Sequence, residues 1–362
     1  MENKKNFWEE LPRPFFALAP MYDVTDSAFR QMFIKCSRGE GVRNATSNEP
    51  ACPVGRPEVV FRTPFVLFTE FVSADGLASD GGRAKLLREL YFVPAEQPIV
   101  AQIFGSKPET IREAVKIIKE LGFAGVDINM GCPDRAVEKQ GSGSALIKNP
   151  QLAREIILAA KEVAGDMPVS VKTRIGYSKI DTENWARIIL ETRPSAVTFH
   201  LRTRKELSKV EAHWEEAEIL GQLGKEYNIP VICNGDVANV EEGKELAKKY
   251  KIDGVMIGRG AFGKPWLFAD ETVRSRISGS LEKRLLTVVE HAQLFEELYL
   301  PGPTNDKLFA GHTKNFSVMR KHFKAYVTGF KRAMALRTRL METQNSKDVG
   351  NIVENFLNSC YN

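Results

Sequence analysis

The 362-residue sequence has no long hydrophobic run and no sign of a secretory leader. A membrane-spanning helix needs roughly 18 or more consecutive apolar residues, and the sequence contains no such stretch. The first residues, MENKKNFWEELPRPFF, lack an apolar segment followed by small residues at a cleavage site. We therefore expect neither membrane insertion nor secretion.

Cysteine is scarce, and the five cysteines stand far apart, at positions 36, 52, 132, 233 and 360. They form no C-x-x-C pair and no Cys/His ligand spacing, which argues against a structural zinc site. Their odd number and wide spacing also argue against a disulfide framework. A reducing cytoplasm is the expected location, and no metal is expected.

Acidic residues are missing from one long segment near the C-terminus. Residues 307–341 contain nine Lys/Arg, two His and no Asp or Glu. The whole chain has a formal net charge of +5, and residues 271–362 supply all of it, with fourteen Lys/Arg against nine Asp/Glu. A charge run is usually a solvated helix face, but an acid-free segment of this length also indicates a polyanionic partner.

Short apolar segments alternate with amphipathic ones through the first 260 residues. Most apolar segments are continuous rather than alternating, which is typical of strands buried on both faces of a parallel sheet. Eight strands alternating with helices predict an α/β fold, a (βα)8 TIM barrel, with a doubly wound open sheet as the alternative. The predicted strands cover residues 15–20, 65–71, 98–105, 125–131, 168–176, 196–203, 230–236 and 254–260.

Polar residues at the carboxyl ends of these strands favour the barrel. In a barrel all eight carboxyl ends meet at one mouth, where active sites lie. The residues at these ends are Met21-Tyr22-Asp23, Thr69-Glu70, Gln102, Asn129, Lys172 with Arg174, His200, Asn234-Gly235-Asp236 and Gly258-Arg259.

Two further regions lie outside the strand pattern. Residues 37–63 are rich in Gly, Pro, Asn and Arg, which predicts a surface insertion. After residue 282 the strand signals stop, and from Phe316 to Phe330 apolar residues recur at spacings of three and four. We expect a barrel over residues 1–275 and an all-α helical domain over 282–362, with an apolar core face and a basic outer face.

Glycines mark the turns after the seventh and eighth strands. Gly235 and Gly258 let the backbone approach a ligand, and loops at these positions often bind phosphate. Arg259 would add a charged fork. The alternative is a pair of tight turns with no ligand. The G-x-G-x-x-G in GRGAFG follows the last strand rather than the first, so it is not a dinucleotide fingerprint.

Three other strand ends resemble the lining of a flavin site. Lys172 ends a buried strand, where a lysine must be paired or functional. His200 is either a ligand or a satisfied core histidine, and Gln102 is a bidentate group that suits the amide edge of a heterocycle. With the phosphate turns, these side chains point to a flavin.

Cys132 follows the fourth strand and faces the predicted mouth. Gly131 and Pro133 hold it in a turn, and Gly141 and Gly143 look like hinges of a lid, with Ser144 as the N-cap of the next helix. A thiol is mostly protonated at neutral pH. Beside a flavin, Cys132 is therefore a candidate proton donor in the reduction of a C=C bond.

Six segments together resemble the signature set of the tRNA-dihydrouridine synthases. The most specific is N-x-G-C-P followed by G-x-G-x-A-L, and the six occur in the same order as in that family, across residues 15–340. The resemblance implies an FMN-binding barrel, a C-terminal tRNA-binding domain, NADPH as reductant and reduction of the uridine C5=C6 bond. The segments are APMYDVTDSAFR, DINMGCPDRAVEKQGSGSAL, VSVKTRIGY, VTFHLRTR, VICNGDV and VMIGRGAFGKPW.

Matched by position, the resemblance implies that Cys132 gives a proton to C5 and that Asn129 positions the uracil. The FMN contacts it implies are Pro20, Met21, Tyr22, Gln102, Lys172, His200, Asn234, Gly235, Asp236, Gly258 and Arg259. We also expect tRNA contacts from Arg174, Arg202, Lys314, Arg320, Lys321 and Lys324.

Two other functions stay open. One is a flavin-dependent reductase of a small pyrimidine or enone, against which the acid-free segment speaks. The other is an RNA-binding protein whose barrel has lost catalysis, against which the intact Cys132, Lys172 and His200 speak. We expect a monomer whose partner is tRNA.

Overall fold

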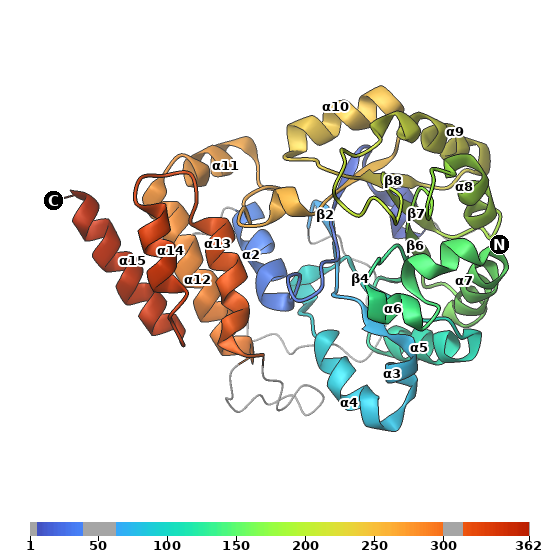
Figure 1. The fold of residues 1–362 in the computed structure, drawn as a ribbon, viewed down its shortest axis with the longest axis horizontal. Coiled ribbons are helices and arrows are strands. Elements are labelled where there is room, and N and C mark those ends of the chain that lie inside the picture. The colour runs from blue at the N-terminus through green and yellow to red at the C-terminus, as the bar shows by residue number, and fades with distance from the viewer. Residues whose placement is uncertain (1–5, 39–62, 300–313, 362) are drawn as a thin grey trace. The chain divides into compact units, whose positions relative to one another are not determined.

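The computed structural model describes residues 6–38, 63–299 and 314–361 (Figure 1). Backbone contacts divide the chain into two compact units. Of the described residues, the barrel unit holds 6–22 and 63–260, and the helical unit holds 23–38, 261–299 and 314–361. The insertion expected at 37–63 falls almost entirely outside the described residues. None of the described helices is long and apolar enough to cross a membrane.

Eight parallel strands close into a barrel, which confirms the predicted fold and excludes the open sheet. Strand β2 pairs with β1 on one side and with β4 on the other, and this pairing closes the ring. A further two-residue strand, β3 (Val72–Ser73), pairs with β4 and lies outside the ring. The eight barrel strands are β1 (Phe15–Leu18), β2 (Phe65–Phe68), β4 (Ile99–Phe104), β5 (Gly125–Met130), β6 (Val169–Arg174), β7 (Ala196–His200), β8 (Val231–Asn234) and β9 (Gly254–Ile257).

Helices surround this ring (Figure 1). In α5, the apolar face is formed by Ile111, Val115 and Ile118, none of which has exposed surface. The barrel unit's helices are α1 (Phe7–Glu10), α3 (Ala74–Ala78), α4 (Asp80–Glu89), α5 (Pro108–Glu120), α6 (Arg135–Lys139), α7 (Pro150–Ala164), α8 (Thr182–Leu190), α9 (Ala217–Tyr227) and α10 (Val240–Tyr250), with 3-10 turns at Pro94–Glu96, Gly143–Lys148 and Trp214–Glu216.

Aromatic residues fill the barrel near the amino ends of its strands. Trp8 has no exposed surface, and its ring centroid lies 5.8 Å from that of Phe15, the first residue of β1. Farther along, the interior positions hold the small residues Ala17, in β1, and Ala19, directly after it. Bulk at one end and small side chains toward the other leave space at the carboxyl end.

The strands end earlier than the sequence pattern predicts. Strand β8 ends at Asn234 rather than at Asp236, and β9 ends at Ile257 rather than at Gly260. Asp236 adopts a positive φ of 57°, which no strand residue adopts. Gly235, Asp236, Gly258 and Arg259 therefore lie just past the strands. Six other polar residues lie within the last residues of theirs: Gln102, Asn129, Lys172, Arg174, His200 and Asn234.

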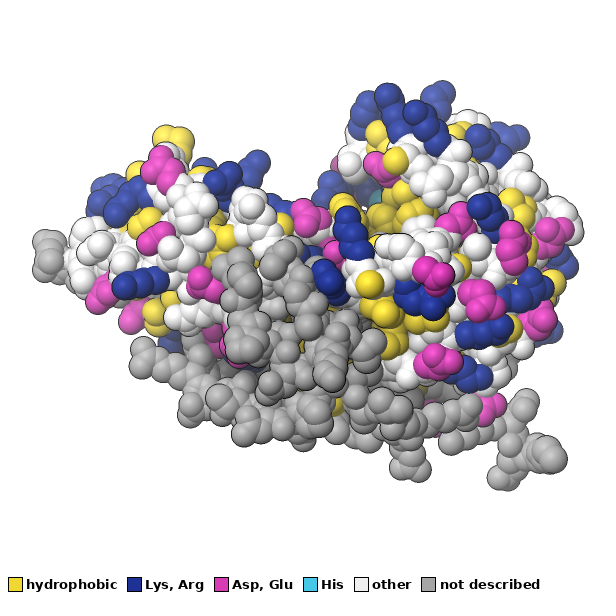
Figure 2. Space-filling model, turned by 90° about the horizontal axis from the view of Figure 1, so that it is seen from below, with side chains coloured by type: hydrophobic (Ala, Val, Ile, Leu, Met, Phe, Trp, Pro, Cys, Tyr) yellow, Lys and Arg dark blue, Asp and Glu magenta, His cyan; other side chains and the backbone are white. Residues whose placement is uncertain are grey.

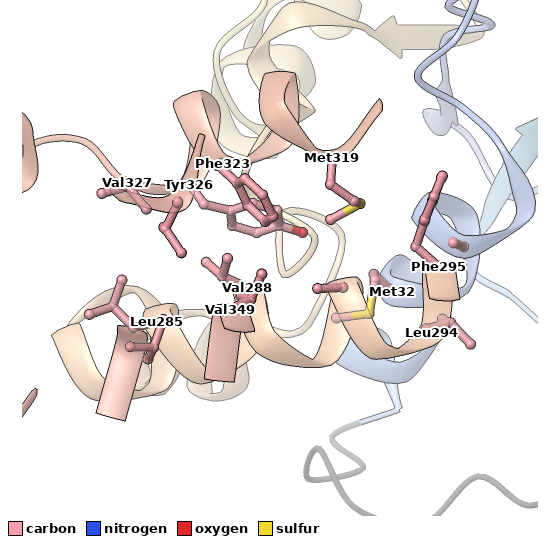
Figure 3. Packing of buried hydrophobic residues seen from close by; sticks show 14 of the residues in the cluster. Met32, Leu285, Val288, Leu294, Phe295, Met319, Phe323, Tyr326, Val327 and Val349 are labelled. Atoms are coloured by element: carbon pink, nitrogen blue, oxygen red, sulfur yellow. The ribbon is translucent and has the colours of Figure 1, made fainter. Parts of the chain in front are cut away.

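The helical unit has its own core, in which buried side chains point toward one another (Figure 3). The predicted apolar repeat lies in it, since Phe316, Met319, Phe323 and Val327 are buried. Helix α2 (Ser27–Ser37), although it follows the first barrel strand, contributes Met32 to the same core. The other elements are α11 (Glu271–Ser278), α12 (Leu281–Tyr299), a 3-10 turn at Phe316–Val318, α13 (Met319–Tyr326), α14 (Ala333–Leu340) and α15 (Ser346–Tyr361).

Candidate active site

A cavity of about 680 Å³ opens at the carboxyl ends of the barrel strands. All eight barrel strands, or the residues directly after them, contribute to its lining. It brings together fourteen residues that the sequence had singled out: Pro20, Met21, Gln102, Asn129, Cys132, Lys172, Arg174, His200, Arg202, Asn234, Gly235, Asp236, Gly258 and Arg259.

Five other predicted residues lie elsewhere. Tyr22 is 70% exposed and packs its ring 5.5 Å from that of Phe71, which does line the cavity. Lys314, Arg320, Lys321 and Lys324 belong to the helical unit.

Two of these four basic residues, Lys314 and Lys321, are paired with acidic residues of the helical unit. Lys314 is only 9% exposed, with its Nζ 3.9 Å from Asp26. Lys321 donates to the backbone oxygen of Asp23 at 2.6 Å and pairs with its carboxylate. Arg320 and Lys324 are exposed.

The turn that carries Cys132 is held by hydrogen bonds from both sides. Asn129 Oδ1 accepts from the backbone N–H groups of Gly131, at 3.1 Å, and Cys132, at 2.9 Å. The carbonyl of Cys132 accepts from the backbone N–H of Ser144 at 3.0 Å. Gly143 is required here, because its φ is +60° and a Cβ would lie 2.8 Å from the Cys132 carbonyl oxygen.

Ser144 does not cap a helix, as the sequence pattern predicted. It lies inside the 3-10 turn Gly143–Lys148, whose cap position is Ser142. Its hydroxyl is 2.8 Å from the carbonyl oxygen of Cys132 and 3.1 Å from Glu138 Oε1. Through these two contacts the Ser144 hydroxyl connects the Cys132 turn to α6.

The Cys132 side chain is half-buried at the cavity. Burial raises the pKa of its thiol, and the hydrogen bond from the Asp134 backbone, which lowers it, does not outweigh burial. The thiol is therefore protonated at neutral pH and can give up a proton.

Arg204, from the loop after β7, fastens the segment that follows Cys132. Its Nε donates to Glu138 Oε2 at 2.8 Å, and its Nη2 lies 3.4 Å from the carbonyl oxygen of Pro133. Both side chains of this ion pair are mostly buried, with 24% and 12% exposed. The pair holds α6 against the β7 loop and so limits the motion of the predicted lid.

Replacing Arg204 with alanine is expected to loosen residues 133–144. Leaving a mostly buried carboxylate without its partner costs about 1–3 kcal/mol. Amide hydrogen exchange in this segment should therefore be roughly 5- to 150-fold faster. The matched control is Arg187→Ala, which removes a surface arginine paired with Glu183 and Glu226 on the outer helices. Equal exchange of residues 133–144 in the two variants would contradict this role of Arg204.

Positive charge dominates the cavity. Lys172, Arg174, Arg202 and Arg259 line it, and Asp236 is the only acidic residue among the described residues of the lining. Asp236 pairs with both Arg202 and Arg259, so it orients these two guanidinium groups. Four cations against one carboxylate make the cavity suited to an anionic ligand.

Arg174 and Lys172 make different contacts in the cavity. Arg174 donates to the carbonyl oxygens of Gly131, at 2.8 Å, and Thr203, at 3.1 Å, so it joins two loops at the mouth. Lys172 lies 3.3 Å from Asn234 Oδ1. Burial, and after it the charge of Arg174, lowers the pKa of Lys172 to about 8.

His200 is a neutral histidine with a defined tautomer. Its Nε2 lies 3.1 Å from Arg202 Nη1. A guanidinium only donates, so Nε2 accepts and the ring proton is on Nδ1. Burial, followed by the charges of Arg174 and Lys172, lowers the pKa of His200 well below its ordinary value. At neutral pH His200 can therefore donate one hydrogen bond from Nδ1 but does not act as a charged acid.

Sequence reasoning missed several residues that shape the site. Phe71 has a signal, since it is the last residue of the strand predicted at 65–71, whereas Leu207 and Ser208 reach the cavity from a long loop and have none. Asp127 also has a signal, namely an acid inside an apolar strand. It is fully buried, and its Oδ2 accepts from Gln102 Nε2 at 2.7 Å. Gln102 Oε1 in turn accepts from Asn129 Nδ2 at 2.9 Å.

Comparison with known proteins identifies the family to which the chain is similar. The family model described as "Dihydrouridine synthase (Dus)" matches residues 17–361. A protein from Staphylococcus aureus (strain COL), described as "Probable tRNA-dihydrouridine synthase", is 41% identical over 357 residues, which is 98% of this chain and 96% of that protein. "Probable tRNA-dihydrouridine synthase 2" of Bacillus subtilis (strain 168) is 38% identical and covers 97% of each chain.

Among solved structures, histamine dehydrogenase from Rhizobium sp. 4-9 has a similar fold. The TM-score is 0.51 at 13% identity, over 78% of this chain and 49% of that one. At this identity the likeness concerns the barrel fold alone. The family match over nearly the whole chain and the relatives at about 40% identity place the protein in the dihydrouridine synthase family.

Proposed function

We propose that the protein is an FMN-dependent tRNA-dihydrouridine synthase that reduces the C5=C6 bond of specific uridines in tRNA with electrons from NADPH. Its family makes it a flavin-dependent oxidoreductase. The observation that carries the finer assignment is the strand-end cavity, which combines four cations with a protonated thiol.

The lining fits FMN in size and charge. A volume of about 680 Å³ is within the usual range of 300–1,000 Å³ for ligand sites. Arg259, with a side chain 65% exposed, is positioned by Asp236 and can meet a phosphate. We assign the phosphate and ribityl chain to Asn234, Gly235, Asp236, Gly258 and Arg259, and the ring to Pro20, Met21, Gln102, Lys172 and His200. Tyr22, outside this lining, would contact FMN only at its edge.

Bound flavin, once reduced, would supply a hydride to C6 of the uracil. Cys132 completes the reduction by giving its thiol proton to C5, which leaves a thiolate. Arg174 and Lys172 both interact favourably with a negative charge on this sulfur, so the thiolate is stabilised until solvent returns a proton. His200, neutral with its proton on Nδ1, contributes a hydrogen bond without competing as an acid.

We assign tRNA phosphate binding to the helical unit. Within the acid-free segment, exposed basic side chains include Arg320 and Lys324 on α13. Lys314 and Lys321 are paired with acids inside the unit, so they would contribute to the potential more than to direct contacts. On the face seen in Figure 2, Lys and Arg side chains are interspersed with Asp and Glu over both units.

Alanine at Arg320 or Lys324 is expected to weaken tRNA binding and to make it less sensitive to salt. Each lost phosphate contact should reduce the slope of log K against log salt by about 1. Binding titrations between low and moderate salt measure this slope. Lys347→Ala, an exposed lysine of the same unit outside the acid-free segment, is the control and should leave the slope unchanged. Equal slopes in all three variants would remove α13 from the tRNA-binding surface.

The test of the proposed function is dihydrouridine formation by the full-length protein. Protein loaded with FMN, together with NADPH and unmodified tRNA, should produce dihydrouridine at defined positions, detected by nucleoside mass spectrometry. Free uridine is the comparison substrate, and it should be reduced far more slowly. Equal efficiency on the two substrates would favour a small-molecule reductase, and a protein that binds tRNA but no flavin would contradict the proposal.

A further inference from the structure

We propose that Asp127 is a positioning residue, whose carboxylate sets the direction of a hydrogen-bond chain that ends at the Cys132 turn. The chain runs from Asp127 through the side-chain amides of Gln102 and Asn129 to the backbone N–H groups of Gly131 and Cys132.

The strand register explains why these side chains meet. Gln102 on β4 is directly paired with Asp127 on β5. Asn129 lies two residues after Asp127, so both side chains point to the same face of β5. Asp127 and Gln102 have no exposed surface, and Asn129 has 7%. Water therefore has little access to the chain, and a hydrogen bond lost between Asp127 and Gln102 would not be replaced by solvent.

The two ends of the chain impose the same direction on both amides. The carboxylate of Asp127 can only accept, so it requires the NH2 group of Gln102, and Gln102 then presents its oxygen to Asn129. At the other end, two backbone N–H groups can only donate, so they require the oxygen of Asn129. The NH2 group of Asn129 is thereby left for Gln102, which completes the chain without a mismatch.

Without an acceptor at position 127, Asn129 alone would hold Gln102 in this orientation, and the NH2 group of Gln102 would be buried without a partner. A reversed Gln102 would favour a reversed Asn129, whose NH2 group would then face two backbone donors. A buried donor without an acceptor is costly, so the turn would open rather than keep this contact. Ser170, whose hydroxyl donates to Asp127 Oδ1 at 2.7 Å, supports the carboxylate but is not part of the chain.

The experiment measures the reactivity of the Cys132 thiol in the full-length protein without cofactor. The rate of alkylation by iodoacetamide is followed across pH, and mass spectrometry of the Cys132 peptide separates it from the exposed Cys360. In Asp127→Leu the turn loosens and the thiol becomes more accessible, so its alkylation should be roughly tenfold faster, the change expected for about one lost buried hydrogen bond. Gln102→Leu breaks the same chain one step later and should give the same change.

Two further variants test whether the direction of the hydrogen bonds matters, rather than the negative charge of Asp127 or a general loosening of the fold around it. Asp127→Asn keeps an acceptor for Gln102 and can donate to the Ser170 hydroxyl, so its alkylation profile should stay close to wild type. Ser170→Ala removes a partner of Asp127 outside the chain and should also leave the profile unchanged.

Two results would each overturn the proposal. Wild-type alkylation in folded Asp127→Leu and Gln102→Leu would overturn the proposal. An effect of Asp127→Asn as large as that of Asp127→Leu would also overturn it, because the charge rather than the direction would then matter. If Asp127→Leu does not fold, Gln102→Leu decides. That the turn matters for turnover rests on the proposed function. Alkylation needs neither flavin nor tRNA, so the hydrogen-bond proposal and the proposed function can fail separately.

Discussion

Replacing Cys132 with alanine is expected to slow dihydrouridine formation by about 10²- to 10⁴-fold, the usual contribution of a positioned general acid. The thiol has a raised pKa and is the group we assign to protonate C5. The turn itself is held through the backbone of Cys132, so removal of the sulfur should leave the cavity intact. Single-turnover assays on tRNA, with flavin content measured by absorbance, check both parts of the expectation.

Two further variants make the result specific to the thiol of Cys132. Serine at position 132 keeps the size but replaces the thiol with a much weaker acid, so turnover should remain low. Cys360→Ala, on the exposed end of α15, should match wild type. Full turnover in Cys132→Ala would assign the proton to another group, and loss of flavin from that variant would mean that the cysteine supports the cofactor instead.

Acid is expected to destabilise the helical unit because of two buried histidines. His291 on α12 and His322 on α13 have no exposed surface, and their ring centroids are 4.6 Å apart. Among the described residues, neither nitrogen of His322 and only one of His291 has a hydrogen-bond partner, the hydroxyl of Tyr326 at 3.3 Å. Phe29 packs against both rings.

Burial lowers the pKa of His291 to about 3. Burial, followed by the charge of His291 and of the neighbouring Lys321 and Lys314, lowers the pKa of His322 well below its ordinary value. The unfolded chain binds protons on both histidines below about pH 6.5, whereas the folded protein does not. The stability that they contribute is therefore complete above pH 6.5 and declines as the pH falls toward 3.

Well below pH 6.5 each histidine should cost about 1.4 kcal/mol per pH unit, and the pair should cost about 3 kcal/mol between pH 6.5 and pH 5. Urea unfolding of wild type and of the double variant His291→Phe/His322→Phe, at several pH values, isolates this contribution as a difference in slope. His213→Gln, a histidine of the barrel unit held by Glu206 and Glu215, is the control and should retain the acid sensitivity of wild type. Parallel pH dependence in wild type and the double variant would show that the buried pair is not responsible.

The barrel could be predicted from the sequence because its signals are local. Continuous apolar strands indicate burial on both faces of a sheet. The spacing of Ile111, Val115 and Ile118 indicates that one face of a helix is buried. A barrel brings all its carboxyl strand ends to one mouth, so residues as distant as Met21 and Gly258 could be assigned to one site without knowledge of any contact.

The hydrogen-bond partners could not be predicted in this way. Ser144 was expected to cap a helix, but its hydroxyl lies beside the carbonyl of Cys132, twelve residues earlier. Gln102 was expected to hydrogen-bond the amide edge of a heterocycle, and in the structure both ends of its own amide are engaged by Asp127 and Asn129. Local patterns do not specify such partners, because they depend on strand register and on loops that meet only in the folded chain.

The sequence by itself indicated where the strands lie, favoured a barrel over an open sheet, and named many of the residues that meet at its mouth, because periodicity and strand direction follow from neighbouring residues. Only the tertiary structure decided that α2 packs in the core of the helical unit and that Lys314 and Lys321 are paired with acids there. It also decided the direction of the chain from Asp127 to Cys132. These depend on which side chains face each other across long separations in the sequence, where burial requires every donor to find an acceptor.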